Sequence, residues 1–408
     1  MIRTKKMGML YFCVNFIFMY ELPEQESRTR LLRLQQSIRE RQADACVITT
    51  SVNQYWLCGS VFDGYILTFA EGDPLLFVKR PLTMKGENVV HIRKPEQITE
   101  LLSEAALPLP KRVLLESDVL PYSAALRLQA ALGMPEIMNV SGILREVRAV
   151  KSEYELNQIR ESAAIHTKVY QLIPSLYRKG MTDLELQIEI ERQMRLHRST
   201  GIFRSYGENM DIFMGSLLAG DNAQAASPYD YALGGEGITP LLPLGANGTS
   251  LMPGTTVMVD MAGNYRPYMD DMTRTFVIEH APDIAYQAHQ VSLDILRTIE
   301  ETTKAGVPCA ELWIIAEKIA TENKLEKYFM GTVQQAKFVG HGVGLEINEP
   351  PVLTARSKEI LQTGMAIAVE PKFVLPGIGA VGIENTYIVH DDRLEKVTRC
   401  EESLIVLS

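Results

Sequence analysis

Cysteines are few in this chain and widely scattered. Only five occur among 408 residues: Cys13, Cys46, Cys58, Cys309 and Cys400. Their odd number argues against a disulfide framework, and none shows the CxxC spacing of a thiolate metal site. Free, scattered cysteines are typical of proteins kept in a reducing compartment, so the sequence predicts a cytoplasmic location.

Positive charge is also in short supply. Lysine and arginine number 41 against 50 aspartates and glutamates, which gives a formal net charge of −9. Bulk nucleic-acid binding needs a basic face, so no nucleic-acid partner is expected. A composition with 46% hydrophobic and 22% charged residues is that of an ordinary soluble globular protein.

No apolar run is long enough to span a bilayer comfortably. The longest candidate, residues 7–20, follows Arg3, Lys5 and Lys6 and is interrupted by Asn15. It is short for a membrane span and lacks a small-x-small cleavage site after it. We expect no stable membrane insertion, and one interpretation of the segment is an extended translation start, with Met19 as the true beginning. An atypical N-terminal signal or anchor is the alternative.

The length of the chain predicts two or three domains, and the pattern of expected helices and strands changes along the sequence. Residues 24–144 alternate an amphipathic helix (28–41) with buried strands (45–50, 65–69 and 113–115), which indicates an α/β layer domain. A charge-rich helical connector is expected over 144–161. Thr182 and Glu185 form a capping box that opens a further helix.

The second half of the chain predicts a different pattern. Gly, Asn and Pro punctuate residues 215–254, which we expect to form a long irregular loop. Strands follow at 256–260 and 273–279, then helices at 282–303 and 309–323, then a final hairpin. Two acid-bearing hairpins separated by helices are compatible with a duplicated half-domain.

Each of these hairpins carries a pair of acids about its turn. Asp260 and Asp271 lie in VMVDMAGNYRPYMDDMTRTF, and Glu370 and Glu384 lie in AVEPKFVLPGIGAVGIENT. Cross-strand partners stand about 4.5–5.5 Å apart at Cβ, so each turn brings two acids face to face. Like charges this close are costly unless neutralised, and a divalent metal would do so. For Asp260 alone, a salt bridge to Arg274 is the simpler alternative.

One histidine has surroundings suited to a ligand. His341 stands between glycines in GHGVG, which permit close backbone approach in a ligand-presenting turn. An ordinary hydrogen-bonded histidine is the alternative, and none of the other six histidines is expected to be a ligand. Four carboxylates and one imidazole suit two divalent ions, Mn²⁺, Co²⁺, Fe²⁺ or Zn²⁺, which together can activate a water.

These segments resemble the pita-bread metallopeptidases, which include Xaa-Pro aminopeptidase, prolidase and methionine aminopeptidase, with creatinase as a relative. The matching pieces are VDMAGNYRPYMDDMTRTF, GHGVGLEINEPP, AVEP and GIENT, in the family's order. Asn53 and residues 55–59 resemble the N-x-x-Y-L-x-G-like turn of the creatinase N-domain. The resemblance implies an α/β (α+β) fold: an extension (1–22), a creatinase/prolidase-like α/β domain (23–147), and a pita-bread catalytic domain (148–408) with a pseudo-twofold antiparallel sheet and flanking helices.

The resemblance also implies a role for each candidate. Asp260 would be a terminal ligand of one metal, Asp271 and Glu384 would bridge two, and His341 and Glu370 would complete the second site. Glu370 would also be the general base that takes a proton from the attacking water. A homodimer is implied as well.

Three positions depart from the family's pattern. Asn348 stands where these peptidases usually carry a histidine, Tyr229 stands at the likely place of another, and Gly382 replaces an arginine common in prolidase-like members. With an insertion over 234–248, these changes predict a rewritten specificity pocket, with Asn348 and Tyr229 as candidate catalytic residues. For Tyr229, an aromatic side chain packed within its loop is the alternative.

The predicted function is that of a metal-dependent hydrolase of the Xaa-Pro aminopeptidase or dipeptidase type, acting on a peptide or small amide. The first alternative is a hydrolase or lyase of a non-peptide small molecule on the same dinuclear site. The second is a catalytically silent metal-binding interaction protein.

Overall fold

The computed structural model describes residues 22–207 and 213–408. The predicted extension at residues 1–22 lies almost wholly outside this part of the chain. The described chain divides into two compact units between Val147 and Arg148, within helix α6 (Ser141–Ala149). No described helix is long and apolar enough to cross a membrane.

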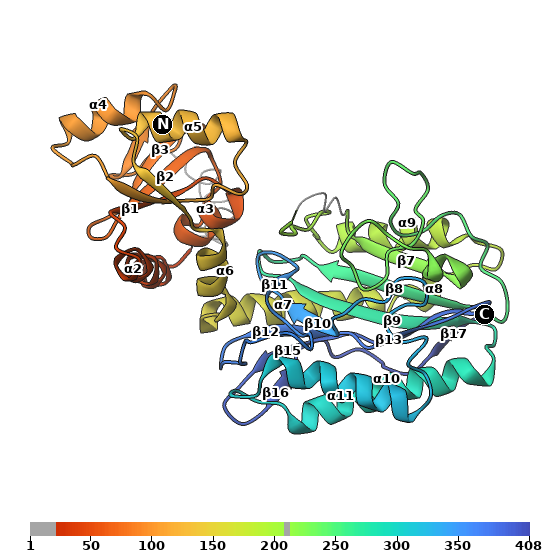
Figure 1. The fold of residues 1–408 in the computed structure, drawn as a ribbon. Helices are drawn as coiled ribbons and strands as arrows, with labels where there is room; N and C mark the ends of the chain where they lie inside the picture. The colour runs from red at the N-terminus through yellow and green to blue at the C-terminus, as the bar shows by residue number, and fades with distance from the viewer. Residues whose placement is uncertain (1–21, 208–212) are drawn as a thin grey trace, which may run out of the picture. The chain divides into compact units, whose positions relative to one another are not determined.

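The N-terminal unit is built on a mixed sheet. Its described strands run in the order β4-β3-β2-β1-β5-β6. Their bounds are β1 (Ala45–Ile48), β2 (Asp63–Phe69), β3 (Leu75–Arg80), β4 (Val89–His91), β5 (Arg112–Leu115) and β6 (Glu136–Asn139). Helices α4 (Gln97–Glu104) and α5 (Tyr122–Ala131) pack on one face, and α2 (Glu24–Glu40) lies on the other (Figure 1).

A helix replaces the turn expected after the first strand. Residues 51–58 form α3 (Ser51–Cys58), which Thr50 caps at its start. The helix ends at Gly59, whose φ of 71° favours glycine. Asn53, part of the resemblance, donates from Nδ2 to Glu116 Oε1 over 2.6 Å. The segment therefore anchors α3 to the loop after β5.

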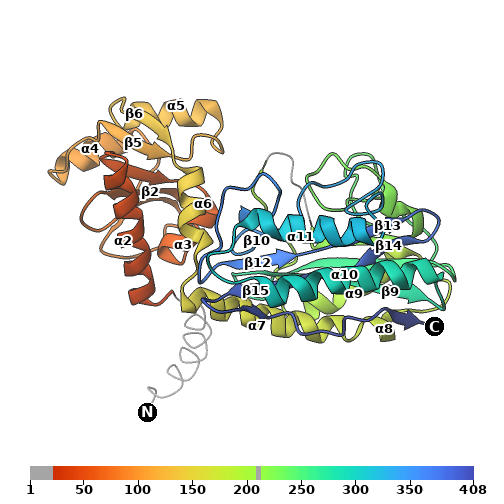
Figure 2. The same cartoon turned by 60° about the horizontal axis from the view of Figure 1, so that its bottom comes forward.

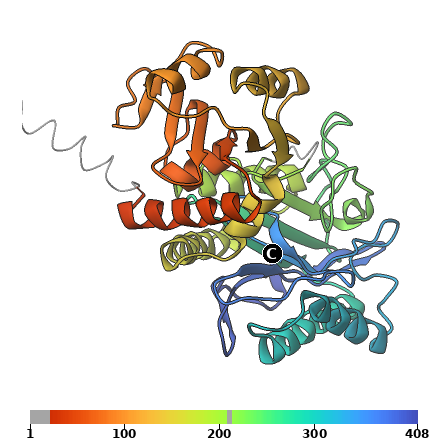
Figure 3. The same ribbon diagram turned by 60° about the vertical axis from the view of Figure 1, so that its left-hand side comes forward.

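The C-terminal unit has two halves, each a sheet with its own helices. In the first, α7 (Glu153–Tyr170), α8 (Ile173–Leu176) and α9 (Asp183–Leu196) accompany β7 (Gly215–Ala219), β8 (Thr256–Gly263), β9 (Asp270–Ile278) and β17 (Ile405–Leu407). In the second, α10 (Asp283–Thr302) and α11 (Cys309–Glu322) run side by side (Figures 2 and 3). They cover β10 (Gly340–Gly342), β11 (Glu349–Val352), β12 (Ala366–Val369), β13 (Lys372–Leu375), β14 (Gly379–Gly382), β15 (Asn385–Val389) and β16 (Leu394–Lys396).

Hydrogen bonds from threonine side chains join the two halves where their strands meet. Thr256 Oγ1 on β8 donates to Ala380 O on β14 over 2.8 Å. Thr275 Oγ1 on β9 donates to Gly382 O over the same distance. Thr386 on β15 accepts from the backbone N–H of Asp271 and donates to its carbonyl. These buried bonds hold the acid-bearing strands of both halves together.

Local signals explain most elements, with two differences from expectation. The capping box of Thr182 and Glu185 is present and opens α9. The expected single connector is instead two helices, because Ser152 forms a second capping box with Glu155 and starts α7 afresh. The stretch 215–254 is not wholly irregular, since its first residues form β7 paired with β8.

Candidate metal centre

The first acid pair lies on β8 and β9, with a register that differs from expectation. Asp260 stands opposite Thr273, and Asp271 stands opposite Ala262. The two acids are therefore diagonal neighbours, not directly facing partners. Because side chains alternate along a strand, the offset of two residues keeps both acids on one face of the sheet.

The second acid pair faces directly across its hairpin. Glu370 follows β12 and Glu384 precedes β15. Val369 pairs with Asn385 on one side of them, and Lys372 pairs with Gly382 on the other. Both pairings keep one register, so Glu370 lies opposite Glu384 as the sequence predicts.

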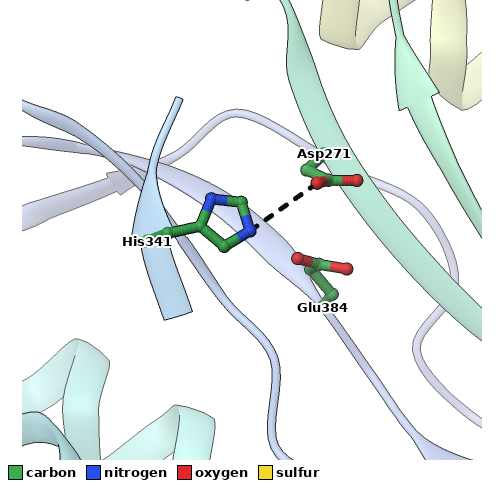
Figure 4. Close-up of side chains that lie close together, drawn as sticks. All are labelled: Asp271, His341 and Glu384. Carbon is green, nitrogen blue, oxygen red and sulfur yellow. Dashed lines mark ion pairs between the residues drawn. The ribbon is translucent and has the colours of Figure 1, made fainter. Parts of the chain in front are cut away.

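His341 comes from a short strand, not from the expected turn. It lies on β10 and pairs with Ala368 of β12. Its Nδ1 lies 3.1 Å from the carbonyl oxygen of Gly342. A carbonyl oxygen only accepts, so Nδ1 carries a proton, and Nε2, on the side of the acids, is the ring nitrogen that could bind a metal. Figure 4 shows Nε2 aimed at Asp271, 3.9 Å from Oδ2.

The five predicted ligands converge on one cavity. Two groups have donor atoms within 4.8 Å of one another: Asp271, His341 and Glu384, and Asp260, Glu370 and Glu384. Glu384 belongs to both, which suits a bridging position. The cavity is lined by all five together with Phe203, Gly215, Ser216, Asp230, Tyr231, Ala232, Leu233, Leu244, Ala262, Phe338, Ile347 and Asn348.

Burial and mutual repulsion raise the pKa values of these acids. Burial and the neighbouring carboxylates Glu370 and Asp260 raise the pKa of Glu384 to about 8, against the opposing effect of Lys372. Burial also raises the pKa of Glu370, and the pKa of Asp271 is raised by burial, Glu384 and Asp260. Holding ionised carboxylates this close together in a buried site costs free energy, and an added cation would reduce that cost.

Lys372 is a site residue that sequence reasoning missed. Its side chain is fully buried, and Nζ lies 2.8 Å from Asp260 Oδ2, 2.6 Å from Glu370 Oε2 and 3.4 Å from Glu384 Oε2. Burial alone would lower the pKa of this ammonium, but the three carboxylates raise it. The available signal was a lysine two residues after Glu370, directly opposite the unusual Gly382.

The first group has donors that fit a divalent ion. Glu384 Oε2 accepts from Thr273 Oγ1 over 2.7 Å, whereas its Oε1 is buried with no hydrogen-bond partner among the described residues. A buried carboxylate oxygen without a partner is costly, and a metal ion would satisfy it. With Asp271 and the Nε2 lone pair of His341, this group is a mixed oxygen and nitrogen set of the kind that divalent transition ions take.

The simpler alternative for Asp260, a salt bridge to Arg274, is wrong. Arg274 does not pair with Asp260: its guanidinium donates to the carbonyls of Thr273 and Glu384 and to Asn385 Oδ1. Asp270 faces away from the site and contacts His166 Nδ1 at 2.8 Å. Within residues 22–207 and 213–408, His341 is the one histidine in either donor group.

The two predicted pocket residues have different surroundings. Asn348 lines the cavity, and its amide bonds both backbone groups of Tyr206, at 2.8 and 2.6 Å. These two hydrogen bonds hold in place the segment that carries Phe203. Tyr229 is absent from the described cavity lining, where Asp230 and Tyr231 stand instead, and its ring packs 5.9 Å from that of Tyr231.

Comparison with known proteins identifies two families that this chain matches. Residues 157–391 match the model of metallopeptidase family M24, and residues 30–150 match the creatinase/prolidase N-terminal domain. A Xaa-Pro dipeptidase of Pyrococcus horikoshii is 26% identical over 365 residues, covering 89% of this chain and 94% of the relative.

Solved structures with the same fold cover nearly the whole chain. The Xaa-Pro dipeptidase from Bacillus anthracis superposes with a TM-score of 0.77 at 23% identity, covering 93% of this chain and 100% of that one. The N-terminal domain of FACT complex subunit SPT16 from Eremothecium gossypii has a TM-score of 0.74 at 16% identity, covering 95% and 100%. These likenesses concern the fold. The match over more than half the residues makes this chain a member of metallopeptidase family M24.

Proposed function

We propose that this protein is a metal-dependent peptidase of the Xaa-Pro type, with its catalytic centre in the C-terminal unit. The observation that carries the proposal is the convergence of Asp260, Asp271, His341, Glu370 and Glu384 on one cavity. The names of relatives, among them a Xaa-Pro dipeptidase, support the substrate class.

A divalent ion held by Asp271, His341 and Glu384 would supply a water of lowered pKa and would polarise the scissile carbonyl. Among divalent ions, we propose Mn²⁺, because carboxylate oxygens dominate the donor set. The hydrogen bond from His341 Nδ1 to the carbonyl oxygen of Gly342 orients the ring and leaves Nε2 as the atom that would bind the metal.

Glu370 is the general base in this proposal. Its Oε2 accepts from Lys372 Nζ over 2.6 Å, and its Oε1 lies on the side of His341, 3.6 Å from Nε2. The carboxylate is thus held in one orientation, with Oε1 toward the group that would bind metal. Burial raises the pKa of Glu370 above its usual range, which makes it a better proton acceptor.

The cavity walls favour a substrate with a free amine and a longer chain. Apolar side chains such as Phe203, Leu244 and Phe338 can pack around a proline ring, while Asp230 can pair with an ammonium. The described lining contains no arginine or lysine to pair with the terminal carboxylate of a dipeptide. We therefore propose an aminopeptidase specificity over a dipeptidase specificity, with Asn348 positioning the wall that carries Phe203.

We propose a cytoplasmic homodimer as the working form of the protein. The four described cysteines, Cys46, Cys58, Cys309 and Cys400, are all free, which supports a reducing compartment. The dimer rests on the resemblance to creatinase-type proteins, and the oligomeric state in solution measured by light scattering would test it.

The function is tested with matched peptides and metal. Xaa-Pro-Xaa tripeptides, Xaa-Pro dipeptides and tripeptides with alanine in place of proline are incubated with manganese-loaded and chelator-treated protein. We expect proline tripeptides to be cleaved at least about tenfold more efficiently than dipeptides, which corresponds to about 1.4 kcal/mol, and chelation to abolish turnover. Turnover of another small amide alone would favour a non-peptide hydrolase. Metal binding with no turnover of any amide would favour a silent interaction protein.

A further inference from the structure

Lys372 places a fixed positive charge among the acids of the second donor group. Its ammonium lies 2.8 Å from Asp260 Oδ2, 2.6 Å from Glu370 Oε2 and 3.4 Å from Glu384 Oε2. These three residues are the members of that group. An ammonium has three N–H donors, and here each has a carboxylate oxygen within reach.

The hairpin makes room for this side chain. Gly382 stands directly opposite Lys372, with a φ of 146°. A Cβ on Gly382 would lie 2.6 Å from the carbonyl oxygen of Pro371, 2.8 Å from Lys372 Cα and 3.3 Å from its Cγ. A side chain at position 382 would therefore force the backbone that carries Lys372 to shift. The glycine and the lysine form one structural arrangement.

The ammonium and a metal ion compete for the same three acids. A divalent ion would sit about 2.0–2.2 Å from the carboxylate oxygens that bind it. The lysine nitrogen already occupies the space between those oxygens at hydrogen-bonding distance. Two cations so close together, with little water between them, repel strongly. The long side chain is held by burial, with no exposed surface, so it cannot turn aside without opening the core.

In the first donor group, Lys372 contacts only Glu384, and no lysine or arginine of the described chain forms an ion pair with Asp271. Asp271, His341 and Glu384 lie close together (Figure 4), and Glu384 Oε1 is a buried atom for which the described residues offer no hydrogen bond. The lysine bonds the other oxygen of Glu384. Glu384 thus has one oxygen near the ammonium and a second, buried oxygen that has no hydrogen bond and could bind a metal.

We propose that the Lys372 ammonium replaces one of the two metal ions that the ligand set alone predicts. The chain then binds one divalent ion, at Asp271, His341 and Glu384, and Lys372 supplies the second positive charge from within the fold. This inference rests on the proposed function only in requiring that a metal binds at all.

Metal stoichiometry tests the inference without reference to activity. Chelator-stripped protein is equilibrated with excess Mn²⁺, freed of unbound ion, and analysed for manganese per chain by elemental analysis. We expect about one ion per chain in the wild type and about two in Lys372→Ala, where the second donor group becomes available. Electron paramagnetic resonance should give the signal of isolated Mn²⁺ in the wild type and of a coupled pair in the variant.

Two further variants guard against misfolding and non-specific charge effects. Lys372→Met keeps most of the volume of the side chain and removes only the charge, so it serves if Lys372→Ala does not fold. Lys396→Ala is the matched control, because Lys396 pairs with Glu300 and Glu402 at 2.7 and 2.8 Å and does not line the cavity. It should retain one ion per chain.

Each outcome decides a different claim. Two ions in the wild type, or one ion in folded Lys372→Ala and Lys372→Met alike, would overturn the role of Lys372 while leaving a metallopeptidase in place. If neither variant folds, the wild-type stoichiometry decides alone, one ion supporting the inference and two refuting it. One bound ion with no peptide turnover would refute the proposed function and leave the inference standing. No bound manganese in any form would overturn both.

Discussion

Two buried clusters of charge in the C-terminal unit differ in their balance. The acid cluster contains Asp260, Asp271, Glu370 and Glu384 around the single ammonium of Lys372. The ion-pair cluster contains Glu346 and Glu349 with Arg148 and Lys151. There, Lys151 Nζ lies 3.0 Å from Glu349 Oε2, Arg148 Nη2 lies 3.2 Å from Glu349 Oε1, and Arg148 also pairs with Glu346. The second cluster is neutral as built, whereas the first has an excess of three negative charges if all its acids are ionised.

The pKa directions follow this difference. Burial would raise the pKa of Glu349, but Lys151 and Arg148 more than offset it and lower the pKa. In the acid cluster, burial and repulsion prevail over Lys372 and raise the pKa of Glu384 to about 8. A cluster whose charges balance stabilises the fold, whereas a cluster with excess negative charge can still bind a further cation. The contrast agrees with the position of the two clusters, because the acids of the acid cluster line the cavity and the ion-pair cluster does not.

The largest expected effect is on the acid cluster through Glu370→Gln. Glutamine keeps the size of the side chain but cannot take a proton, so kcat should fall by about 10²–10⁴-fold. Manganese content should remain near that of the wild type, since His341, Asp271 and Glu384 are untouched. Steady-state kinetics and elemental analysis on the same sample measure both. Glu346→Gln, in the ion-pair cluster, is the control and should keep kcat within about twofold. A Glu370→Gln protein of near-wild-type kcat would remove Glu370 as the base.

Next in size is a loss of stability from the ion-pair cluster. Glu349→Gln leaves Arg148 and Lys151 buried with one acid between them, and breaking a buried pair in this way costs about 3–5 kcal/mol. Glu349 also accepts from the backbone N–H groups of Leu345 and Glu346. Urea unfolding should show a reduced free energy of unfolding, while the folded fraction keeps its kcat and manganese content. A variant with unchanged stability and lost metal would assign Glu349 to the metal centre and erase the distinction between the clusters.

A smaller effect should appear in the pH dependence of the metal-free protein. The pKa of Glu384 is about 8 in the folded protein and near its ordinary value of about 4.3 when unfolded. Between these values the folded state binds more protons, so stability falls as pH rises. The melting temperature in chelator should therefore drop by several degrees from about pH 6 to pH 8.5, and added Mn²⁺ should restore more stability at the higher pH. Parallel melting curves with and without metal would contradict this. Glu349 of the ion-pair cluster should contribute no such trend in that range, since its pKa is lowered by Lys151 and Arg148.

The acids and the helix starts were predictable because their signals are local. A capping box is readable from Thr182 and Glu185 alone, and acids set symmetrically about a turn predict a shared face. What could not be read is register and long-range contact. A shift of two residues made Asp260 and Asp271 diagonal, and Ser152 started a new helix where one connector was expected. Lys372 escaped notice because its partners lie on three separate segments, and only the folded hairpin brings its ammonium to them.

The smallest expected effect concerns the rim of the acid cluster. Asn348 lines the cavity, but its side-chain amide forms two hydrogen bonds with the backbone of Tyr206. Asn348→Ala should therefore loosen the segment that carries Phe203 and raise KM for proline peptides several-fold, with kcat little changed, because binding of ground state and transition state is lost together. Tyr229→Phe, outside the described cavity lining, is the control and should leave both constants near wild type. A fall in kcat of a hundredfold or more, with KM unchanged, would instead place the Asn348 amide on the reacting atoms. Asn348, which stands where the family's pattern has a histidine, would then take part in catalysis together with the acid cluster.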